Sequence, residues 1–357
     1  MNSVGILNFH FANNFGAVLV PFAMINIIEK LGYRAEVINY VPKPTPNRKN
    51  FIEFRRKFLR IGKNIPVLRT LEEISEAQHG FDRIVVGSDQ VWRLFDTSIY
   101  MLDFVHGNRL LISYAASFGG SSFSKLTNEK ATSLLNRFDA ISVREDTGVT
   151  ICNEQFGLPA MQVLDPTMLL DESDYASIIT HFTPDTMSSS YIAYSIINKN
   201  NTDNLQKNLE SISRSFKLEL KNILMSADHS EVNSVGGWLN DIKNAKLVIT
   251  DSFHATVFSI LYKKDFVCVV SGSNGTDRIP SLLKMLGIDP SERIVKSLSD
   301  IDPLILNKHI NYTSVSANLL KHRKKSILFL KNALGKEVNY KLPYTLKNTL
   351  LKPENSK

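Results

Sequence analysis

A chain of 357 residues is long enough for two domains of average size, and its 43% apolar and 22% charged residues are typical of a globular protein. Its 42 Lys and Arg against 35 Asp and Glu leave a net charge of +7, which suits an anionic substrate, an acidic membrane surface or nucleic acid without choosing among them. Cys152 and Cys268 form no CxxC pair or Cys/His cluster, which disfavours a structural zinc site and indicates buried, reduced thiols. We see no signal peptide and no apolar run of the roughly 20 residues that a membrane span needs, so we expect a soluble, cytoplasmic protein.

The chain opens with a strand, a loop, a helix and a second strand. Residues 4–7 are apolar and precede a polar, Gly-containing loop at 8–16. Apolar residues between Val18 and Ile28 then recur at helical spacing, Gly32 suits a helix C-terminus, and residues 36–40 form the next strand. This order predicts the first unit of a Rossmann-like domain.

Residues 41–70 are expected to be irregular, with a Pro-rich stretch followed by a basic amphipathic segment at 51–63. Four strands follow, each ending in polar or small residues: Gly87-Ser88-Asp89, Ser117-Phe118-Gly119-Gly120, Arg144-Glu145 and Asp165-Pro166. In parallel sheets, ligands bind beyond the carboxyl ends of the strands. These residues are therefore predicted to share one active-site edge.

Residues 171–187 are expected to be a connector to a second set of strands and helices. Strands are predicted at 191–197, 217–225 and 266–270, with helices at 204–213 and 280–286. A last helix at 317–333 precedes a basic tail. We therefore predict an α/β fold with two Rossmann-like domains, at 1–170 and 171–310, followed by a C-terminal helix and tail at 311–357.

The most informative segment is the strand-to-helix junction at 247–261. The apolar run Leu247-Val248-Ile249-Thr250 ends in Asp251-Ser252-Phe253-His254, and an apolar segment at helical spacing follows. A helix start offers free N–H groups and a partial positive charge, which suit an anion. Because a titratable imidazole stands there, the segment indicates an enzyme that acts on a small anionic substrate.

Six segments, in order along most of the chain, resemble those of the polysaccharide pyruvyl transferase family. They are Asn14-Phe15-Gly16-Ala17, residues 84–92 (IVVGSDQVW), residues 113–119 (SYAASFG), Ile141-Ser142-Val143-Arg144-Glu145, Leu164-Asp165-Pro166-Thr167 and Thr250-Asp251-Ser252-Phe253-His254. The resemblance implies two Rossmann-like domains that face a cleft, as in GT-B glycosyltransferases, with the acceptor side in the first domain and the donor side in the second. It also implies transfer of the pyruvyl (carboxyvinyl) unit of phosphoenolpyruvate to a sugar of a bacterial surface-polysaccharide precursor, forming a ketal and releasing phosphate.

His254 is our candidate acid/base for the two proton steps that ketal formation requires. Asp251 either orients this imidazole or caps the helix, and Ser252 either donates to the phosphate or caps it. Some family members carry an Arg at the position of Ser252, so Arg278 is our candidate for the missing cation. Arg144 is assigned to donor binding because a guanidinium binds carboxylate or phosphate with two hydrogen bonds; the alternative is an ion pair with Glu145.

On the acceptor side the candidates are Asn14, Gly16, Asp89 and Trp92. Asn14 and Gly16 serve either the ligand or the turn, and Asp89 serves either an acceptor hydroxyl or a helix cap. Trp92 would stack under a sugar, although burial is the commoner fate of Trp. Asp165, before a proline, is interpreted as a turn residue. No metal ligand set is indicated, and no cofactor is expected beyond phosphoenolpyruvate as donor.

Basic clusters at 55–57 and 321–325 suit at most a peripheral contact with a membrane carrying a lipid-linked acceptor, and a solvated helix face is the favoured interpretation. No nucleic-acid-binding motif is present. The acceptor sugar and the oligomeric state are left open. Two other hypotheses remain: a nucleotide-sugar glycosyltransferase of GT-B-like fold, and a non-catalytic family member that binds a glycan or an anion, which the Ser at position 252 keeps open.

Overall fold

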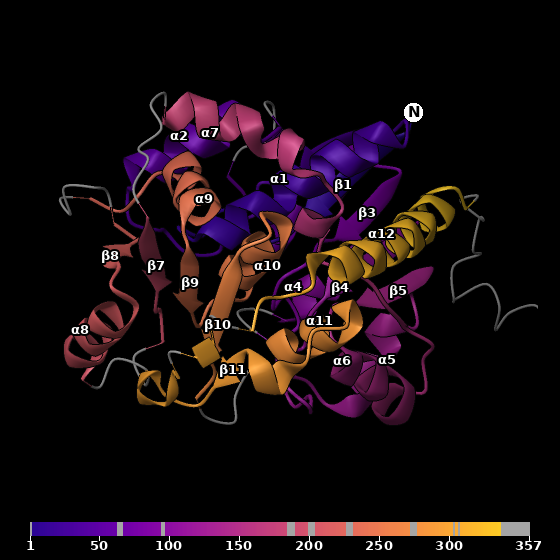
Figure 1. Cartoon of the computed structure of the whole chain (residues 1–357). Coiled ribbons are helices and arrows are strands. Elements are labelled where there is room, and N and C mark those ends of the chain that lie inside the picture. The colour runs from indigo at the N-terminus through magenta and orange to yellow at the C-terminus, as the bar shows by residue number, and fades with distance from the viewer. Residues whose placement is uncertain are drawn as a thin grey trace, which may run out of the picture.

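The structure is a computed structural model that describes residues 2–62, 67–93, 97–183, 190–198, 204–225, 231–271, 277–302, 304–305 and 308–336. Within these residues, two parallel β-sheets lie side by side, each covered by helices (Figure 1). The first half of the chain builds one sheet and the second half builds the other. The predicted α/β class is confirmed.

The first sheet contains six parallel strands in the order β2-β1-β3-β4-β5-β6. The strands are β1 (Ser3–Leu7), β2 (Arg34–Val37), β3 (Arg83–Val86), β4 (Leu110–Ala116), β5 (Ala140–Val143) and β6 (Met161–Gln162). The chain runs outward from β1 to β2 and then returns to place β3 on the other side of β1. This reversal makes a topological switch point at the carboxyl ends of β1 and β3, where ligands of such sheets bind.

The helices of the first half are α1 (Phe15–Lys30), α2 (Lys49–Phe58), α3 (Leu71–Ala77), α4 (Thr97–Tyr100), α5 (Asn128–Leu135) and α6 (Asp146–Thr150). Helix α1 is buried on nearly every side, as its apolar sequence requires, and the Asn14 side chain caps it by accepting from the Ala17 N–H. The basic amphipathic segment predicted after the Pro-rich stretch forms α2, which buries Phe51 and Phe54.

The second sheet contains five parallel strands in the order β11-β10-β9-β7-β8. These are β7 (Tyr191–Ser195), β8 (Glu219–Asn222), β9 (Leu247–Thr250), β10 (Asp265–Val269) and β11 (Ile294–Val295), and the helices between them are α8 (Leu205–Phe216), α9 (Val235–Asn244), α10 (Phe253–Leu261) and α11 (Arg278–Leu286). Strand β9 is fully buried and leads directly into α10, as the sequence predicted.

Two further helices join the halves. The segment expected to be only a connector contains α7 (Ala176–Phe182), which packs so closely on α9 that a Cβ at Gly236 would lie 2.5 Å from the Ile178 carbonyl oxygen. Helix α12 (Tyr312–Leu334) runs across both halves (Figure 1). Its Arg323 donates to the carbonyls of Met168 and Leu170, and its Asn318 donates to the Leu286 carbonyl. The predicted basic tail beyond residue 336 lies outside the described residues.

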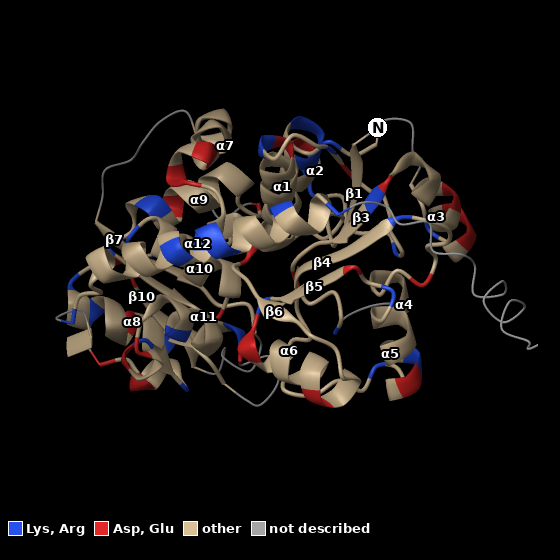
Figure 2. Ribbon diagram, turned by 90° about the vertical axis from the view of Figure 1, so that its right-hand side faces the viewer, with Lys and Arg blue, Asp and Glu red and all other residues tan. Residues whose placement is uncertain are grey.

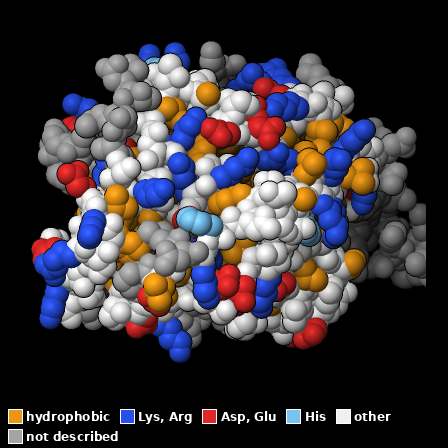
Figure 3. All heavy atoms as spheres, viewed as in Figure 1, with side chains coloured by type: hydrophobic (Ala, Val, Ile, Leu, Met, Phe, Trp, Pro, Cys, Tyr) orange, Lys and Arg blue, Asp and Glu red, His pale blue; other side chains and the backbone are white. Residues whose placement is uncertain are grey.

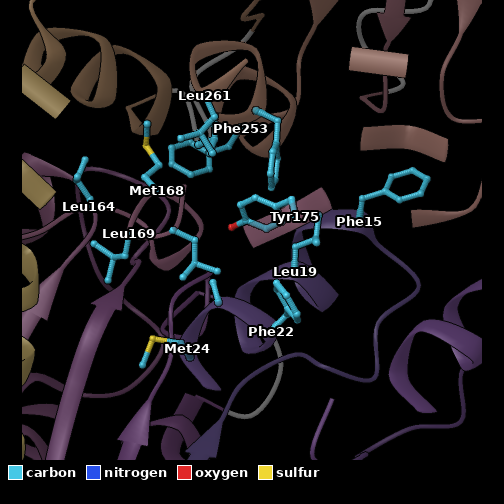
Figure 4. Packing of buried hydrophobic residues seen from close by; sticks show 14 of the residues in the cluster. Phe15, Leu19, Phe22, Met24, Leu164, Met168, Leu169, Tyr175, Phe253 and Leu261 are labelled. Atoms are coloured by element: carbon cyan, nitrogen blue, oxygen red, sulfur yellow. The ribbon is translucent and has the colours of Figure 1, made fainter. Parts of the chain in front are cut away.

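One apolar cluster extends through both halves. Tyr175 lies near Phe22 of α1 (Figure 4), with ring centroids 5.9 Å apart, and its ring centroid is 5.0 Å from that of Phe258 of α10. Phe15 of α1 stacks on Trp238 of α9 at 4.9 Å. Because these contacts join helices from different sheets, the two halves hold each other in a defined relative position.

Charge is distributed rather than concentrated on the face shown in Figure 3, where Lys and Arg lie among acidic and neutral side chains. Among the described residues, no helix is both long enough and apolar enough to cross a membrane.

Candidate active site

Arg144, Asp165 and His254 meet where the two halves touch. Arg144 follows β5, Asp165 follows β6, and His254 lies in the first turn of α10. The Arg144 Nη1 atom lies 3.2 Å from Asp165 Oδ2, and the His254 Nε2 atom lies 3.6 Å from the same oxygen. Their exposed fractions are only 4%, 1% and 7%, so water screens these charges little.

The Asp165 carboxylate is held by four donors besides the imidazole. Ser88 Oγ donates to Oδ2 at 2.8 Å, while the backbone N–H and the hydroxyl of Thr167 donate to Oδ1 at 3.0 and 2.6 Å. Burial by itself would raise the pKa of the carboxyl, but the interactions with His254, Arg144 and Thr167 outweigh burial and hold this pKa well below its usual range. Asp165 is therefore an anion at neutral pH.

Gly16, at the start of α1, lies directly against the His254 ring. A Cβ at this position would overlap the imidazole, with the Cε1 atom only 2.5 Å away. A glycine is therefore required here for close approach of the first helix to the imidazole, and α1 forms one wall beside His254.

Two guanidinium groups face the same aromatic ring next to the imidazole. The Cζ atoms of Arg144 and Arg278 lie 4.2 and 6.0 Å from the centroid of Phe253. Burial, and then repulsion by Arg144, lower the pKa of Arg278 to about 10, although Asp89 and Glu145 partly oppose this shift. Arg278 remains a cation at neutral pH, so the protein places its charge beside the buried guanidinium of Arg144.

The two arginines come from different halves that Ser281 of α11 ties together. Its hydroxyl accepts from the Asp146 N–H at 3.0 Å and from Gln162 Nε2 at 2.8 Å. These bonds fix α11, which begins at Arg278, against the segment that carries Arg144.

Asp89 lies at the rim of this group in a strained conformation. Its φ of +99° falls in a region that side-chain-bearing residues rarely adopt, and such strain is concentrated at functional sites. Its Oδ1 lies 3.7 Å from Arg144 Nη2.

Glu145, the residue after Arg144, is fully buried and accepts hydrogen bonds from the Ser117 hydroxyl and from the Phe118 and Gly119 N–H groups, so it anchors the loop after β4.

Comparison with known proteins identifies the family. A model of the polysaccharide pyruvyl transferase family matches residues 14–273, a range that includes every site residue described above except Arg278 and Ser281. The chain belongs to this family. Membership of this family makes the protein a transferase of polysaccharide pyruvylation, with a sugar as acceptor. A search of curated proteins found no match.

Solved structures match the pyruvyl transferase only as a fold. UDP-GlcNAc 2-epimerase from Neisseria meningitidis, bound to UDP-GlcNAc, is 9% identical over 98% of both chains with a TM-score of 0.51. Phytolacca americana UGT2, complexed with UDP-2fluoro-glucose and pterostilbene, is 11% identical over 91% of this chain and 94% of its own, with a TM-score of 0.48. The predicted GT-B-like arrangement of two Rossmann-like domains is confirmed.

The structure of the pyruvyl transferase brings some predicted site residues together and leaves others apart. His254, Arg144, Arg278, Asp89 and Gly16 converge. The Ser252 hydroxyl accepts from the Ala255 N–H as the N-cap of α10, and the Asp251 carboxylate accepts from the Ile197 and Asn198 N–H groups at 2.8 and 2.7 Å. Asp251 thus holds the loop after β7, the neighbouring strand.

Trp92 is fully buried, and its indole N–H donates to the Tyr100 carbonyl at 3.0 Å. Since neither of its faces reaches solvent, we leave it out of the acceptor site proposed below. Asn14 uses its side-chain oxygen to cap α1 and shapes the loop before Gly16.

Sequence reasoning assigned Asp165 to a turn and thereby missed the carboxylate that faces His254. Its turn contacts exist, but only through Oδ1, while Oδ2 faces Ser88, Arg144 and His254. A signal was available, because an Asp directly after a strand at the same sheet edge as Arg144 should lie near it. Among the described residues no group of His, Cys, Asp and Glu is arranged to hold a metal ion.

Proposed function

We propose that this pyruvyl transferase takes its pyruvyl unit from phosphoenolpyruvate and forms a cyclic ketal on a sugar of a bacterial surface-polysaccharide precursor. The observation that carries this proposal is the confinement of Arg144 and Arg278 around one aromatic ring, beside His254. Two neighbouring cations, Arg144 buried and Arg278 partly buried, repel each other and favour a ligand with two negative groups, and phosphoenolpyruvate has a phosphate and a carboxylate.

In this proposal the guanidiniums bind the two ends of the donor. A guanidinium binds a carboxylate or a phosphate through two parallel hydrogen bonds, which fix orientation as well as charge. The Arg144 Nε and Nη2 atoms are buried without a hydrogen-bond partner in the described part of the protein, so they remain available as donors. Their use by a ligand would satisfy polar groups whose isolation costs free energy.

His254 then performs the proton steps. As an imidazolium it protonates the terminal vinyl carbon, which becomes a methyl group, and C2 becomes electrophilic. A sugar hydroxyl attacks C2 and loses its proton, the C2–O bond to phosphate breaks, and a second hydroxyl closes the ketal and loses its own proton. One of the two hydroxyl protons balances the methyl group, and the other leaves with phosphate.

Asp165 and Asp89 support different parts of this sequence. The ionised Asp165 supplies the negative charge that stabilises an imidazolium at His254. Asp89, partly exposed at the rim, is placed to accept a hydrogen bond from the acceptor hydroxyl. The strained backbone at Asp89 is consistent with a side chain that the fold aims at the reacting centre.

The test is phosphate release from phosphoenolpyruvate with galactose- and mannosamine-containing acceptors, measured for wild type, His254→Ala and the control His309→Ala. His309 is an exposed histidine paired with Asp265. Acceptor-dependent release that collapses in His254→Ala and persists in His309→Ala supports the proposal.

Release that survives His254→Ala removes the acid/base assignment. The absence of release with every acceptor, in folded protein that does not bind phosphoenolpyruvate, removes the donor. That result favours a nucleotide-sugar glycosyltransferase or a non-catalytic binding protein.

A further inference from the structure

A second polar site lies at the same sheet edge, below a strap that follows β2 and contains α2. We define the strap as residues 41–62, and the strap cavity as the hollow of about 470 Å³ that it encloses with the first loop. Its lining includes His10 and Asn39 from the ends of β1 and β2, and Arg55 and Arg56 from α2. A second hollow of about 390 Å³ adjoins it, shares Phe11 and Thr45 with it, and adds Lys43 and Arg48.

Among the described residues, the lining of both hollows is positive and contains no Asp or Glu. Figure 2 marks the Lys and Arg positions along the ribbon of α2 in blue. On the exposed surface such a helix would simply be solvated, but here one of its cations is withdrawn from water. A charged wall without carboxylates at a concave site is the electrostatic pattern of an anion-binding pocket.

Arg55 is the central cation of the strap cavity. Its guanidinium is partly buried, and burial lowers its pKa. It reaches only neutral acceptors, the carbonyls of Phe11 and Ala12 at 3.4 and 3.5 Å and Asn13 Oδ1 at 3.3 Å, and it forms no ion pair with the described residues. A partly desolvated guanidinium with three long, neutral hydrogen bonds gains most from an anionic partner.

His10 and Asn39 complete a wall that carries polar groups without negative charge. His10 is buried, and its Nε2 lies 3.2 Å from Asn39 Oδ1. Burial, helped by the charge of Arg55 and opposed by the bonds to Asn39 and Asn8, lowers the pKa of His10 to about 4. His10 is therefore neutral at pH 7, and the positive charge of the cavity comes from Arg55 and Arg56.

The strap cavity is connected to the catalytic centre through the first loop. Asn13 bonds both the strap, through the Pro46 carbonyl at 2.7 Å, and Arg55. Gly16, which lies against His254, follows Asn13 by three residues, so the Cα atoms of Asn13 and Gly16 are at most about 11 Å apart. A ligand in the cavity therefore lies within reach of a short glycan that enters the site of pyruvyl transfer.

We propose that the strap cavity binds a phosphate or diphosphate group carried by the acceptor, with the Arg55 guanidinium as its principal ligand. The identification of the carrier as the acceptor rests on the proposed function, whereas the anion site itself rests on the cavity and its charges. Apolar side chains of Val41, Ile52 and Leu59 also line the cavity, so the phosphate group belongs either to a nucleotide or to an isoprenoid.

Binding of inorganic pyrophosphate, UDP and farnesyl diphosphate, measured by calorimetry without phosphoenolpyruvate, tests the site. The variants are Arg55→Gln and the control Lys57→Gln, which removes the same charge from the same helix at an exposed residue that does not line either hollow. We expect Arg55→Gln to weaken pyrophosphate binding at least about tenfold, since a charge-assisted hydrogen-bond pair is lost, and Lys57→Gln to change it less than about twofold. Arg55→Lys, which keeps the charge but loses the fork, should fall between these.

If substitutions of Arg55 weaken pyrophosphate binding and Lys57→Gln does not, the site is supported. This conclusion holds even if phosphoenolpyruvate is not the donor, because the assay measures binding and not catalytic turnover. Tighter binding of UDP than of pyrophosphate identifies a nucleotide carrier, and tighter binding of farnesyl diphosphate an isoprenoid. Equal loss in Lys57→Gln, or binding that Arg55→Gln leaves intact and that therefore occurs at Arg144 and Arg278, overturns the proposal. Unfolding midpoints of the variants, measured in parallel, separate loss of binding from loss of fold.

Discussion

Substitution of Gly16 by Ala tests whether the first helix positions the catalytic imidazole. The added methyl group would lie 2.5 Å from His254 Cε1, whereas ordinary contacts of a Cβ begin at 3.4 Å. Because the Nδ1 and Cγ atoms of the ring would lie nearer still, the ring or the helix must move by more than about 1 Å, and a displacement of that size at a reacting group costs on the order of 100-fold in rate. We expect a fall of this order in the rate of phosphate release.

The stability effect should be smaller and should depend on the imidazole. Overpacking costs about 1–3 kcal/mol, while Ala in place of Gly within a helix gains about 0.5–1 kcal/mol, so the net loss is about 2.5 kcal/mol at most. In a His254→Ala background the clash is absent, and Gly16→Ala should then stabilise by the helix gain alone. Urea unfolding of the two single variants and the double variant measures this cycle.

The control is Gly80→Ala, where an added Cβ meets nothing within 4 Å. Full activity of Gly16→Ala, or the same loss of stability with and without the imidazole, would refute the reasoning.

Three other substitutions or treatments have defined outcomes. Asp165→Asn should destabilise the protein by about 3–5 kcal/mol at pH 7, because it breaks a buried ion pair. Since the folded-state pKa of Asp165 is lowered, its contribution is fully present above the unfolded-state value of about 4 and declines as the pH falls from there through the folded-state pKa, so the difference in unfolding free energy between wild type and variant should shrink steadily below pH 4. Cys152 and Cys268, whose thiol pKa values burial raises to about 12, should not react with a thiol reagent at pH 8 until urea unfolds the protein, and earlier reaction would contradict their burial. Phe15→Ala should cost about 3–5 kcal/mol and shift the Trp238 emission to the red, because it removes the ring stacked on that indole; an unchanged spectrum would argue against this contact between the halves.

Local signals were sufficient for most elements of the fold. The run from Leu247 to His254 was recognised as a strand, a turn and a helix because burial on both faces of a parallel strand demands a continuous apolar run, and because the helix keeps its own period. Helix α7 was not predicted, and its segment was expected to be a connector. Its few apolar residues carry a weak periodic signal, and its stability comes from packing on Gly236 of α9.

The chemistry-bearing residues were only partly assignable from the sequence. Arg144 directly follows a strand, His254 lies four residues beyond one, and the family motifs contain both, so both were recognised from the sequence. The partner of His254 was assigned to Asp251, three residues away, but the nearest carboxylate belongs to Asp165, 89 positions earlier. Sequence proximity favours the first assignment, whereas the actual neighbour depends on how the second half docks on the first.

By itself, the sequence determined the alternation of strands and helices, the two-domain α/β class and the family, because these depend on local periodicity and on motifs within single segments. Only the tertiary structure decided which residues share a site. The pairing of Arg144 with Arg278, the contact of Gly16 with the imidazole and the hollow beside Arg55 each join segments distant in the chain. Their positions follow from the packing of α1, α11 and the strap across the two sheets, and packing of that kind has no local pattern in the sequence.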